Sequence, residues 1–253
     1  MAQKTRLSAI RKKLKTEKKV AVAELSREYG VTEETIRRDL EKLEQEGFAN
    51  RTYGGAVLNV GNMAEKVSYV RRAEKNKEEK AIIGRLASVA IPEKATIATD
   101  ASTTVMEALR EMKDRTGITV LTNSVQTIYE LENPSLNLII TGGRYNPSTG
   151  SLQGTITRSV MEGYYVDIVL LSCKALDLDG GFMDTNVEEA EVKRVMVEHG
   201  KKVIMCVDHT KFNKIAFTRL LAIQEVDTLI TDRKPDDEWL ETFKQKNVEV
   251  IYP

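Results

Sequence analysis

Apolar residues recur at helical spacing near the start of the chain. Leu7, Ile10 and Leu14 lie three and four residues apart, which predicts an amphipathic helix. Val22 and Leu25 begin a second apolar face after a short break. The first 30 residues therefore predict two helices, each with one side turned toward a core.

Gly30 and Thr32 separate the second predicted helix from a third. Glycine tolerates the left-handed conformation that ends many helices, and a threonine hydroxyl can cap the next one. The third helix carries Ile36, Leu40 and Leu43 on one apolar face and is predicted to end at Gly47. A short helix, a tight turn and a longer helix make up the layout of a helix-turn-helix, whose second helix enters the DNA major groove.

A short polar segment, residues 50–58, follows the third helix. It contains the glycine pair Gly54 and Gly55 and is long enough for two strands joined by a turn. We therefore expect a winged helix-turn-helix domain over residues 1–58.

The pattern changes after this domain. Residues 59–80 are polar and charged and predict a linker that passes into a helix near Asn76. From residue 81 to residue 253, short β-rich runs alternate with amphipathic stretches, which predicts an α/β domain with a mostly parallel sheet covered on both faces. The expected strands are Ala95–Thr99, Ile118–Leu121, Leu136–Thr141, Asp167–Leu171, Lys202–Val207, Thr228–Thr231 and Val248–Ile251.

Charge is divided unevenly between the two halves of the chain. The net charge is zero, yet residues 1–80 hold 19 Lys/Arg against 13 Asp/Glu, and residues 81–253 hold 19 against 25. A basic head on an acidic body is typical of a protein whose head binds nucleic acid. Random scatter of surface charge is the alternative.

Other classes are disfavoured. No apolar run approaches the roughly 18 residues of a membrane span, and residues 1–15 lack the apolar segment of a secretory signal. Cys173 and Cys206 show no CxxC spacing, so we expect reduced thiols in a cytoplasmic protein. His209 has no metal-ligand partners in the sequence, and we expect neither a metal nor a cofactor.

The exposed side of the third helix predicts the DNA-reading surface. Arginine can bridge guanine O6 and N7, and a threonine methyl can pack on a thymine methyl. The wing would reach the DNA backbone or the minor groove. A three-helix scaffold with a solvated arginine pair is the alternative. The expected DNA-binding residues are Thr32, Glu34, Thr35, Arg37, Arg38, Arg51 and Tyr53.

Polar loops follow several of the predicted strands. Residues 100–104, Asp-Ala-Ser-Thr-Thr, follow one strand and open a helix, which places hydroxyl and N–H donors where an anion can bind. Similar loops occur at 122–124, 142–144 and 208–211. Converging on one sheet edge, they predict a pocket for a small, polyhydroxylated, anionic ligand. Helix capping alone explains any single loop equally well.

The run V-T-E-E-T-I-R-R-D-L-E-K-L-E at 31–44, followed by Y-G-G-A at 53–56, closely resembles the signature of DeoR-family repressors. The resemblance covers essentially the whole chain and reaches the family's sensor domain, which is similar to ribose-5-phosphate isomerase. The matching segments are D-A-S-T-T at 100–104, T-N-S at 122–124, G-G at 142–143, E-E-A-E-V-K-R at 188–194 and D-H-T-K-F at 208–212.

The resemblance implies an effector site in which hydroxyls at 102–104 hold a phosphate. Two departures from the family pattern matter: many members have glycine in place of Ser102, and residues 172–177 differ from the commoner glycine-rich version. The implied effector-binding residues are Asp100, Ser102, Thr103, Thr104, Asn123, Gly142, Gly143, Lys174, Asp177, Glu189 and Lys211.

We therefore expect a DNA-binding transcription regulator, a repressor of a sugar-metabolism operon controlled by a phosphorylated sugar. Its partners would be double-stranded operator DNA, the effector and further copies of itself in a homodimer or homotetramer, with no membrane. We expect no catalytic residue. Two alternatives remain: a sugar-phosphate isomerase or deaminase carrying a DNA-binding appendage, whose carboxylates and lysines would serve as base and electrophile, and a C-terminal domain that serves only assembly.

Overall fold

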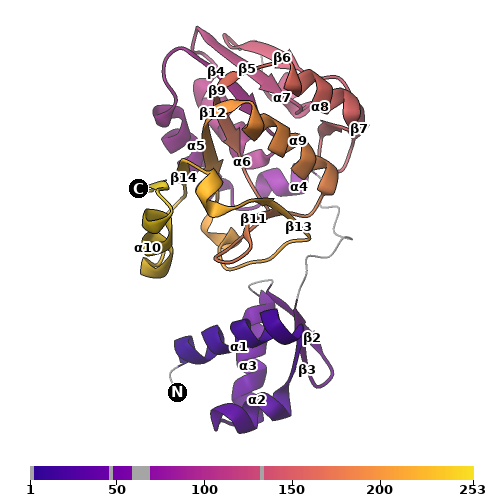
Figure 1. Cartoon of the computed structure of the whole chain (residues 1–253), viewed down its shortest axis with the longest axis vertical. Helices are drawn as coiled ribbons and strands as arrows, with labels where there is room; N and C mark the ends of the chain where they lie inside the picture. Colours follow the sequence, from indigo (N-terminus) through magenta and orange to yellow (C-terminus); the bar gives the residue numbers. More distant parts are fainter. Residues whose placement is uncertain (1–2, 46–47, 59–68, 132–133) are drawn as a thin grey trace. The chain divides into compact units, whose positions relative to one another are not determined.

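The computed structural model describes residues 3–45, 48–58, 69–131 and 134–253 (Figure 1). The chain divides into two compact units. The first holds Met1–Asn62 and Asn213–Ile215, and the second holds Met63–Phe212 and Ala216–Pro253.

The first unit contains three helices and a small antiparallel sheet with strand order β1-β3-β2. Its elements are α1 (Gln3–Glu17), β1 (Lys19–Ala21), α2 (Val22–Tyr29), α3 (Glu33–Gln45), β2 (Ala49–Thr52) and β3 (Gly55–Leu58). The three predicted helices and the predicted wing are all present. The predicted end of the third helix at Gly47 lies outside the described residues.

Strand β1 was not predicted, because three residues beside a lysine pair are too short for a period-two pattern. It pairs with β3 and closes the wing against the helices. Gly55 makes this approach possible: a Cβ there would lie 1.9 Å from the carbonyl oxygen of Val20. The apolar residues predicted to face the core are buried, including Ile10, Leu25 and Ile36.

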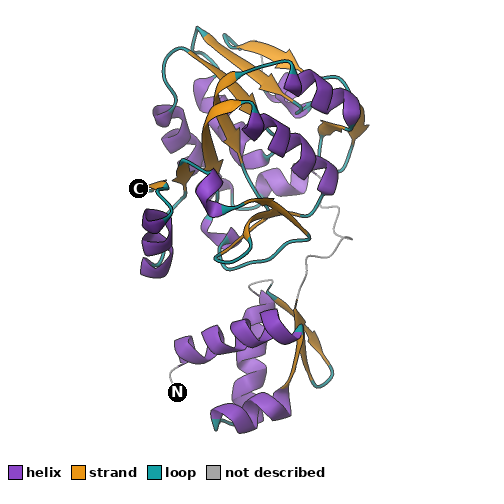
Figure 2. Ribbon diagram, viewed as in Figure 1, coloured by secondary structure: helices purple, strands orange, loops and turns teal. Residues whose placement is uncertain are grey.

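The second unit is built on a seven-stranded sheet with the order β15-β14-β12-β9-β4-β5-β6 (Figure 2). Every neighbouring pair in it is parallel. The strands are β4 (Ala95–Thr99), β5 (Ile118–Thr122), β6 (Asn137–Ile140), β9 (Val166–Leu171), β12 (Gly200–Cys206), β14 (Thr228–Ile230) and β15 (Glu249–Ile251). The seven predicted strands are confirmed, with ends that differ by at most two residues.

Helices cover both faces of this sheet, as the alternating pattern predicted. Along β9, Ile168 and Leu170 pack into a core with α5 and α6, whereas Val169 and Leu171 pack into a second core with α9 and α10. The helices of the unit are α4 (Tyr69–Glu74), α5 (Lys77–Ala90), α6 (Thr103–Met112), α7 (Gln126–Glu130), α8 (Thr155–Glu162), α9 (Val187–Glu198) and α10 (Asp237–Gln245).

Two small antiparallel sheets were not predicted. One pairs β7 (Arg144–Asn146) with β8 (Ser151–Gln153), and the other has the order β10 (Ala175–Asp177), β11 (Gly181–Asp184), β13 (Thr218–Leu221). Each strand has only three or four residues, which is too few for periodicity to identify. Both sheets extend the loops at the carboxyl edge of the large sheet.

The predicted linker is partly helical. Residues 59–68 lie outside the described residues, but 69–80 form α4 and the first turn of α5, with the side chain of Tyr69 buried. The helix expected near Asn76 begins at Lys77. The domain boundaries at 58 and 80 stay predictions.

Among the described residues, no helix combines the length and hydropathy needed to cross a bilayer. Cys173 and Cys206 are both free and buried. Burial raises the pKa of the Cys173 thiol to about 12, so it stays protonated at neutral pH.

Candidate functional site

The turn between α2 and α3 is fixed by its own hydrogen bonds. Gly30 adopts the left-handed conformation with φ 63°, as predicted for a helix C-terminus. The Ser26 hydroxyl donates to the Val31 carbonyl at 2.6 Å, and the Val31 amide donates to the Ser26 carbonyl. Thr32 then caps α3, because its hydroxyl accepts from the Thr35 amide at 3.3 Å. These contacts set the angle at which α3 leaves the turn.

Helix α3 separates its core face from its exposed face. Ile36 and Leu40 are fully buried, and Glu34, Arg37 and Arg38 are exposed. Each arginine pairs with a glutamate one turn back along the helix. Arg37 lies 2.7 Å from Glu33, and Arg38 lies 3.4 Å from Glu34. Exposed pairs of this kind contribute only a few tenths of a kcal/mol, roughly. DNA phosphate or a guanine edge can therefore replace them at little cost.

The wing presents the other two predicted DNA contacts. Tyr53, in the turn between β2 and β3, is fully exposed. Arg51 is exposed on β2 and lies 3.8 Å from a carboxylate oxygen of Glu41. Thr32 and Thr35 bond each other through their hydroxyls at 2.9 Å. The structure therefore leaves the arginines, Glu34 and Tyr53 displayed, while the two threonine hydroxyls support the helix start.

Sequence reasoning gave Asp39 no role, although it lies inside the T-I-R-R-D-L run. Asp39 is fully buried, and its carboxylate is 2.5 Å from the Arg6 guanidinium nitrogen. This ion pair ties α1 to α3 beneath the DNA-reading face. Breaking a buried pair leaves an uncompensated charge and is strongly destabilising, so Asp39 holds α3 in place.

The second unit contains a pocket at the carboxyl ends of β4, β9 and β12. Its volume is about 60 Å³, several times what one water molecule needs. Three strand-end loops and four α-helices (α4, α5, α6 and α9) contribute to it. The lining residues are Arg72, Lys75, Asn76, Lys80, Asp100, Ala101, Ser102, Thr103, Thr104, Ser172, Cys173, Lys174, Glu189, Lys193, Asp208 and Lys211.

Seven of the eleven predicted effector residues line this pocket: Asp100, Ser102, Thr103, Thr104, Lys174, Glu189 and Lys211. The other four do not line it. Asn123 is buried and donates to the Leu152 carbonyl at 3.0 Å. Asp177 accepts from backbone amides in the β10–β11 turn.

Gly142 and Gly143 form a close approach to α8. The Gly142 carbonyl accepts from the Thr157 hydroxyl at 2.7 Å. Gly143 has φ 133°, and a Cβ there would lie 2.1 Å from the Thr157 hydroxyl oxygen. In the structure packing requires glycine at position 143, which a glycine pair after a strand does not reveal in the sequence.

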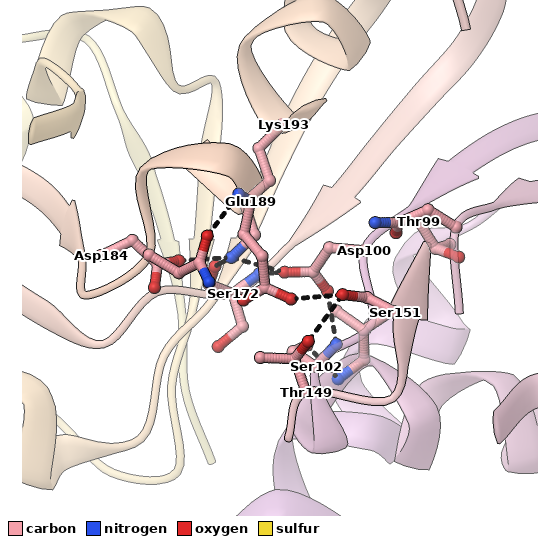
Figure 3. A network of polar contacts seen from close by, with 12 residues as sticks. Thr99, Asp100, Ser102, Thr149, Ser151, Ser172, Asp184, Glu189 and Lys193 are labelled. Atoms are coloured by element: carbon pink, nitrogen blue, oxygen red, sulfur yellow. Dashed lines mark hydrogen bonds and ion pairs between the residues drawn. The ribbon is translucent and has the colours of Figure 1, made fainter. Parts of the chain in front are cut away.

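A buried ammonium organises the pocket floor (Figure 3). Lys193 Nζ lies 2.9 Å from Asp100 Oδ2 and 2.7 Å from Asp184 Oδ2, and it donates to the Ser172 carbonyl at 2.8 Å. Burial opposes ionisation of Lys193, but the carboxylates around it outweigh burial and raise its pKa. Asp100 also accepts from the Ser102 and Ser172 amides. Asp100 therefore positions the loop at the start of α6.

Neither Lys193 nor Asp184 was predicted. Lys193 belongs to the E-E-A-E-V-K-R segment, but a lysine within a helical run is usually a solvated residue, so only tertiary structure reveals its role. Burial opposes ionisation of Asp184 too, and the charges of Lys193 and Lys174 outweigh it and lower its pKa. Lys193 and Asp184 therefore face each other as oppositely charged groups.

Glu189, one turn before Lys193 on α9, is held by hydroxyl groups. Its Oε1 accepts from the Ser151 hydroxyl at 2.8 Å, and Ser151 in turn is 2.7 Å from the Thr149 hydroxyl (Figure 3). Near the third loop, Asn76 Nδ2 donates to Asp208 Oδ1 at 3.1 Å. Burial opposes ionisation of Asp208, but the charge of Lys211 and hydrogen bonds from Thr210 outweigh it and lower its pKa.

Cationic side chains outnumber acidic ones around the pocket, by six to three. The cations repel one another. Burial, together with the charges of Lys211 and Arg72, lowers the pKa of Lys80 to about 8. Burial and the same two cations also lower the pKa of Lys174 to about 8. Such a pocket favours a ligand that carries two negative charges, which would relieve the repulsion.

Comparisons with known proteins agree for both units. Residues 6–61 match the model of the DeoR-like helix-turn-helix domain, and residues 75–233 match that of the DeoR C-terminal sensor domain. The chain is 31% identical to the HTH-type transcriptional regulator GolR of Listeria innocua, over 92% of this chain and 91% of the relative.

Two further relatives have informative names. The HTH-type transcriptional repressor GlcR of Bacillus subtilis is 31% identical over 99% of this chain and 96% of its own. The L-fucose operon activator of Haemophilus influenzae is 29% identical over 92% of this chain and 93% of its own. Among solved structures, ribose 5-phosphate isomerase A from Methanocaldococcus jannaschii aligns with a TM-score of 0.40 and 13% identity, over 55% of this chain and 56% of its own.

We predict that Lys193→Met destabilises the second unit by about 3–5 kcal/mol, because two buried carboxylates lose their counter-charge. Trp239, the only tryptophan, is buried in this unit, so its fluorescence during urea unfolding reports on this unit alone. The matched control is Lys201→Met, which removes an exposed pair to Asp167 and is expected to leave stability nearly unchanged, because solvent screens such a pair. Equal losses in the two variants would contradict the role given to Lys193.

We also predict that anion affinity falls as pH rises above 8. A bound dianion stabilises protonated lysine and so raises the pKa of Lys80 and Lys174 from about 8. Binding therefore takes up protons above pH 8, and each lysine that must be protonated weakens binding by up to about tenfold per pH unit there. Sulfate, a dianion throughout this range, is the probe, measured by calorimetry between pH 7 and 9.5 in two buffers of different ionisation enthalpy. An affinity independent of pH would refute the prediction.

Proposed function

Because this chain belongs to the DeoR family of helix-turn-helix transcriptional regulators, we propose that it represses a sugar-metabolism operon under the control of a phosphorylated sugar bound in the second unit. One observation carries the ligand part of the proposal: six cationic side chains, against three acidic ones, surround a small pocket at a helix start. A DNA-binding regulator acts on the chromosome, so we propose the cytoplasm as its location.

The geometry supports a phosphate ester as the charged part of the ligand. The first turn of a helix leaves backbone amides without intrahelical partners and carries the positive end of its dipole. Helix α6 starts at Thr103, with Ser102 as N-cap, and the hydroxyls of Thr103 and Thr104 are beside it. Lys80, Lys174 and Lys211 add positive charge.

The rest of the ligand is proposed to be a sugar. Glu189 and Asp208 are pocket carboxylates that can accept from hydroxyl groups, as sugars require. The relative named as an L-fucose operon activator and the relative named as a repressor support sugar-linked control of transcription. We propose that the chain shares this kind of control.

We propose that the pocket binds its ligand without transforming it. General acid–base catalysis needs a carboxylate or amine free to exchange a proton with the substrate. Asp100 is engaged with Lys193 and two amides, and Glu189 with Ser151. These acids hold the pocket together. The relatives are named as regulators, which supports the same reading.

Binding of DNA is proposed to involve at least two copies of the chain. A helix-turn-helix gains affinity by placing two copies on half-sites, about one helical turn apart or a multiple of it. We therefore propose a homodimer or homotetramer that binds repeated or palindromic sites, with Glu34, Arg37, Arg38, Arg51 and Tyr53 among the contacts.

Arg38→Ala is expected to weaken DNA binding. If Arg38 contacts a base, the loss should be about 1–3 kcal/mol with relaxed specificity; if it contacts phosphate, the salt slope should fall by about one. The measurement is a salt titration of binding to a duplex that the wild-type protein selects from a random pool. Arg85→Ala, an exposed arginine on α5, controls for the loss of one charge. Wild-type affinity and slope for Arg38→Ala would remove it from the interface.

A ligand panel tests the sensor. Each sugar phosphate is compared with its free sugar by thermal shift of the full-length protein, since a ligand at 100 times its Kd stabilises the native state by about 2.7 kcal/mol. We expect stabilisation only by phosphorylated members. Replacing both Thr103 and Thr104 by valine should abolish this stabilisation, whereas exposed Thr116→Val should not. Equal stabilisation by a sugar and its phosphate would overturn the proposed ligand class.

A further inference from the structure

One wall of the pocket comes from a part of the chain that its sequence assigns to a linker. Arg72 and Lys75 belong to or directly follow α4, and Asn76 and Lys80 lie at the start of α5. They supply three of the six pocket cations. Helix α4 is also the first described element after residues 59–68, which connect it along the chain to the DNA-binding unit.

A single backbone oxygen on this wall accepts hydrogen bonds from two pocket donors. The Arg72 carbonyl accepts from Lys80 Nζ and, at 3.4 Å, from the Thr103 hydroxyl. Lys80 and Thr103 are both buried, and both line the pocket. In the structure, these donors hold the C-terminal end of α4 against the start of α6.

The Arg72 side chain ties the same helix to the far side of the pocket. Its guanidinium donates to the Thr149 carbonyl at 2.8 Å and lies 5.5 Å from the ring centroid of Tyr69. The Thr149 hydroxyl bonds the Ser151 hydroxyl, which in turn donates to Glu189. Helix α4 is thus held in two ways: Lys80 and Thr103 bond the Arg72 carbonyl, and the Arg72 guanidinium bonds Thr149.

A bound anion competes for the donors that hold α4. Hydrogen bonds to a charged oxygen are roughly twice as strong as those to a neutral carbonyl. The Thr103 hydroxyl has one proton and cannot serve both acceptors. The Lys80 ammonium has three protons, but the attraction of a dianion draws it away from the Arg72 carbonyl.

We propose that Lys80 is a principal anion-binding side chain of the pocket and that, with Thr103, it exchanges the Arg72 carbonyl for the ligand, so that occupancy releases α4. The inference rests on the proposed function. It names the element through which ligand binding reaches the residues that join the two units. A ligand shifts DNA affinity only if it binds two arrangements differently, and the Arg72 carbonyl distinguishes them: bonded without ligand, released with it.

The test compares Lys80→Met and Lys80→Arg with Lys77→Met in the full-length protein. Lys77 is exposed on the same helix and is absent from the pocket lining. The probes are inorganic phosphate and the sugar phosphate that gives the largest stabilisation in the panel. Calorimetry measures their affinity, and binding to a duplex selected by the wild-type protein is measured with and without each probe.

Lys80→Met should weaken binding of both probes at least about tenfold, the loss of one charge-assisted hydrogen bond. Lys80→Arg and Lys77→Met should stay near wild type. Without any ligand, Lys80→Met should bind the duplex with the affinity of ligand-saturated wild type, and added ligand should change that affinity no further. This signature holds whether the ligand releases or tightens DNA binding.

Two results overturn the inference. The first is a probe affinity of Lys80→Met equal to that of Lys77→Met, and the second is a ligand-free DNA affinity of Lys80→Met equal to that of ligand-free wild type. If Lys80→Met does not fold, Thr103→Val takes its place, because it removes one donor without removing charge. The same two measurements, probe affinity and ligand-free DNA affinity, then test the inference. If neither probe binds the wild type or alters its DNA affinity, the proposed function itself fails; a responsive wild type with an equally responsive Lys80→Met rejects this inference alone.

Discussion

The buried Lys193 ammonium is the interaction on which the sensor pocket depends. It joins helix α9 to the loops after β4 and β9 and to the end of β11, through Asp100, Ser172 and Asp184. Desolvating three charges is costly, and only close, fully hydrogen-bonded geometry offsets that cost. Because Asp100 is fixed by this pairing and also accepts from the Ser102 amide, the network sets where α6 begins. The hydroxyl and amide donors at 102–104, which we propose bind the anion, are therefore positioned by a buried charge.

The large sheet could be predicted because its central strands are buried on both faces and read as short apolar runs between polar loops. Helix caps such as Gly30 and Thr32 are similarly local signals. The pocket could be predicted only in part, because strand-end loops identify the edge of the sheet but not which side chains meet across it. Lys193 and Lys80 lie on helices, where a lysine normally reads as solvated, and α4 has the charged composition of a linker. Tertiary contacts, including the burial of Tyr69, decide its conformation.

Within each motif, residues that fold the protein are interleaved with residues that face a partner. Asp39 is buried in a pair with Arg6, one residue from exposed Arg38. In the sensor, Asp100 orients the loop whose threonines line the pocket. A motif match therefore marks a segment that must keep its structure, and burial separates the two roles. Thr32 is an example: its hydroxyl is used at the helix start, although the motif alone suggests DNA contact.

Positive charge is presented in two different geometries in this protein, one in each unit. Residues 81–253 hold 19 Lys/Arg against 25 Asp/Glu, and they supply three of the six pocket cations, while Arg72, Lys75 and Lys80 supply the other three. Within residues 81–253 the pocket takes as many acidic as basic side chains, so the rest of this segment keeps its acidic excess, which repels DNA phosphates. The pocket, about 60 Å³ in volume, concentrates positive potential where only a small anion can enter, as low-dielectric walls focus a field. The basic first unit has exposed arginines on a helix instead, a geometry that admits a duplex. The size of each site and the exposure of its cations, more than net charge, thus distinguish the proposed effector pocket from the proposed DNA-binding surface.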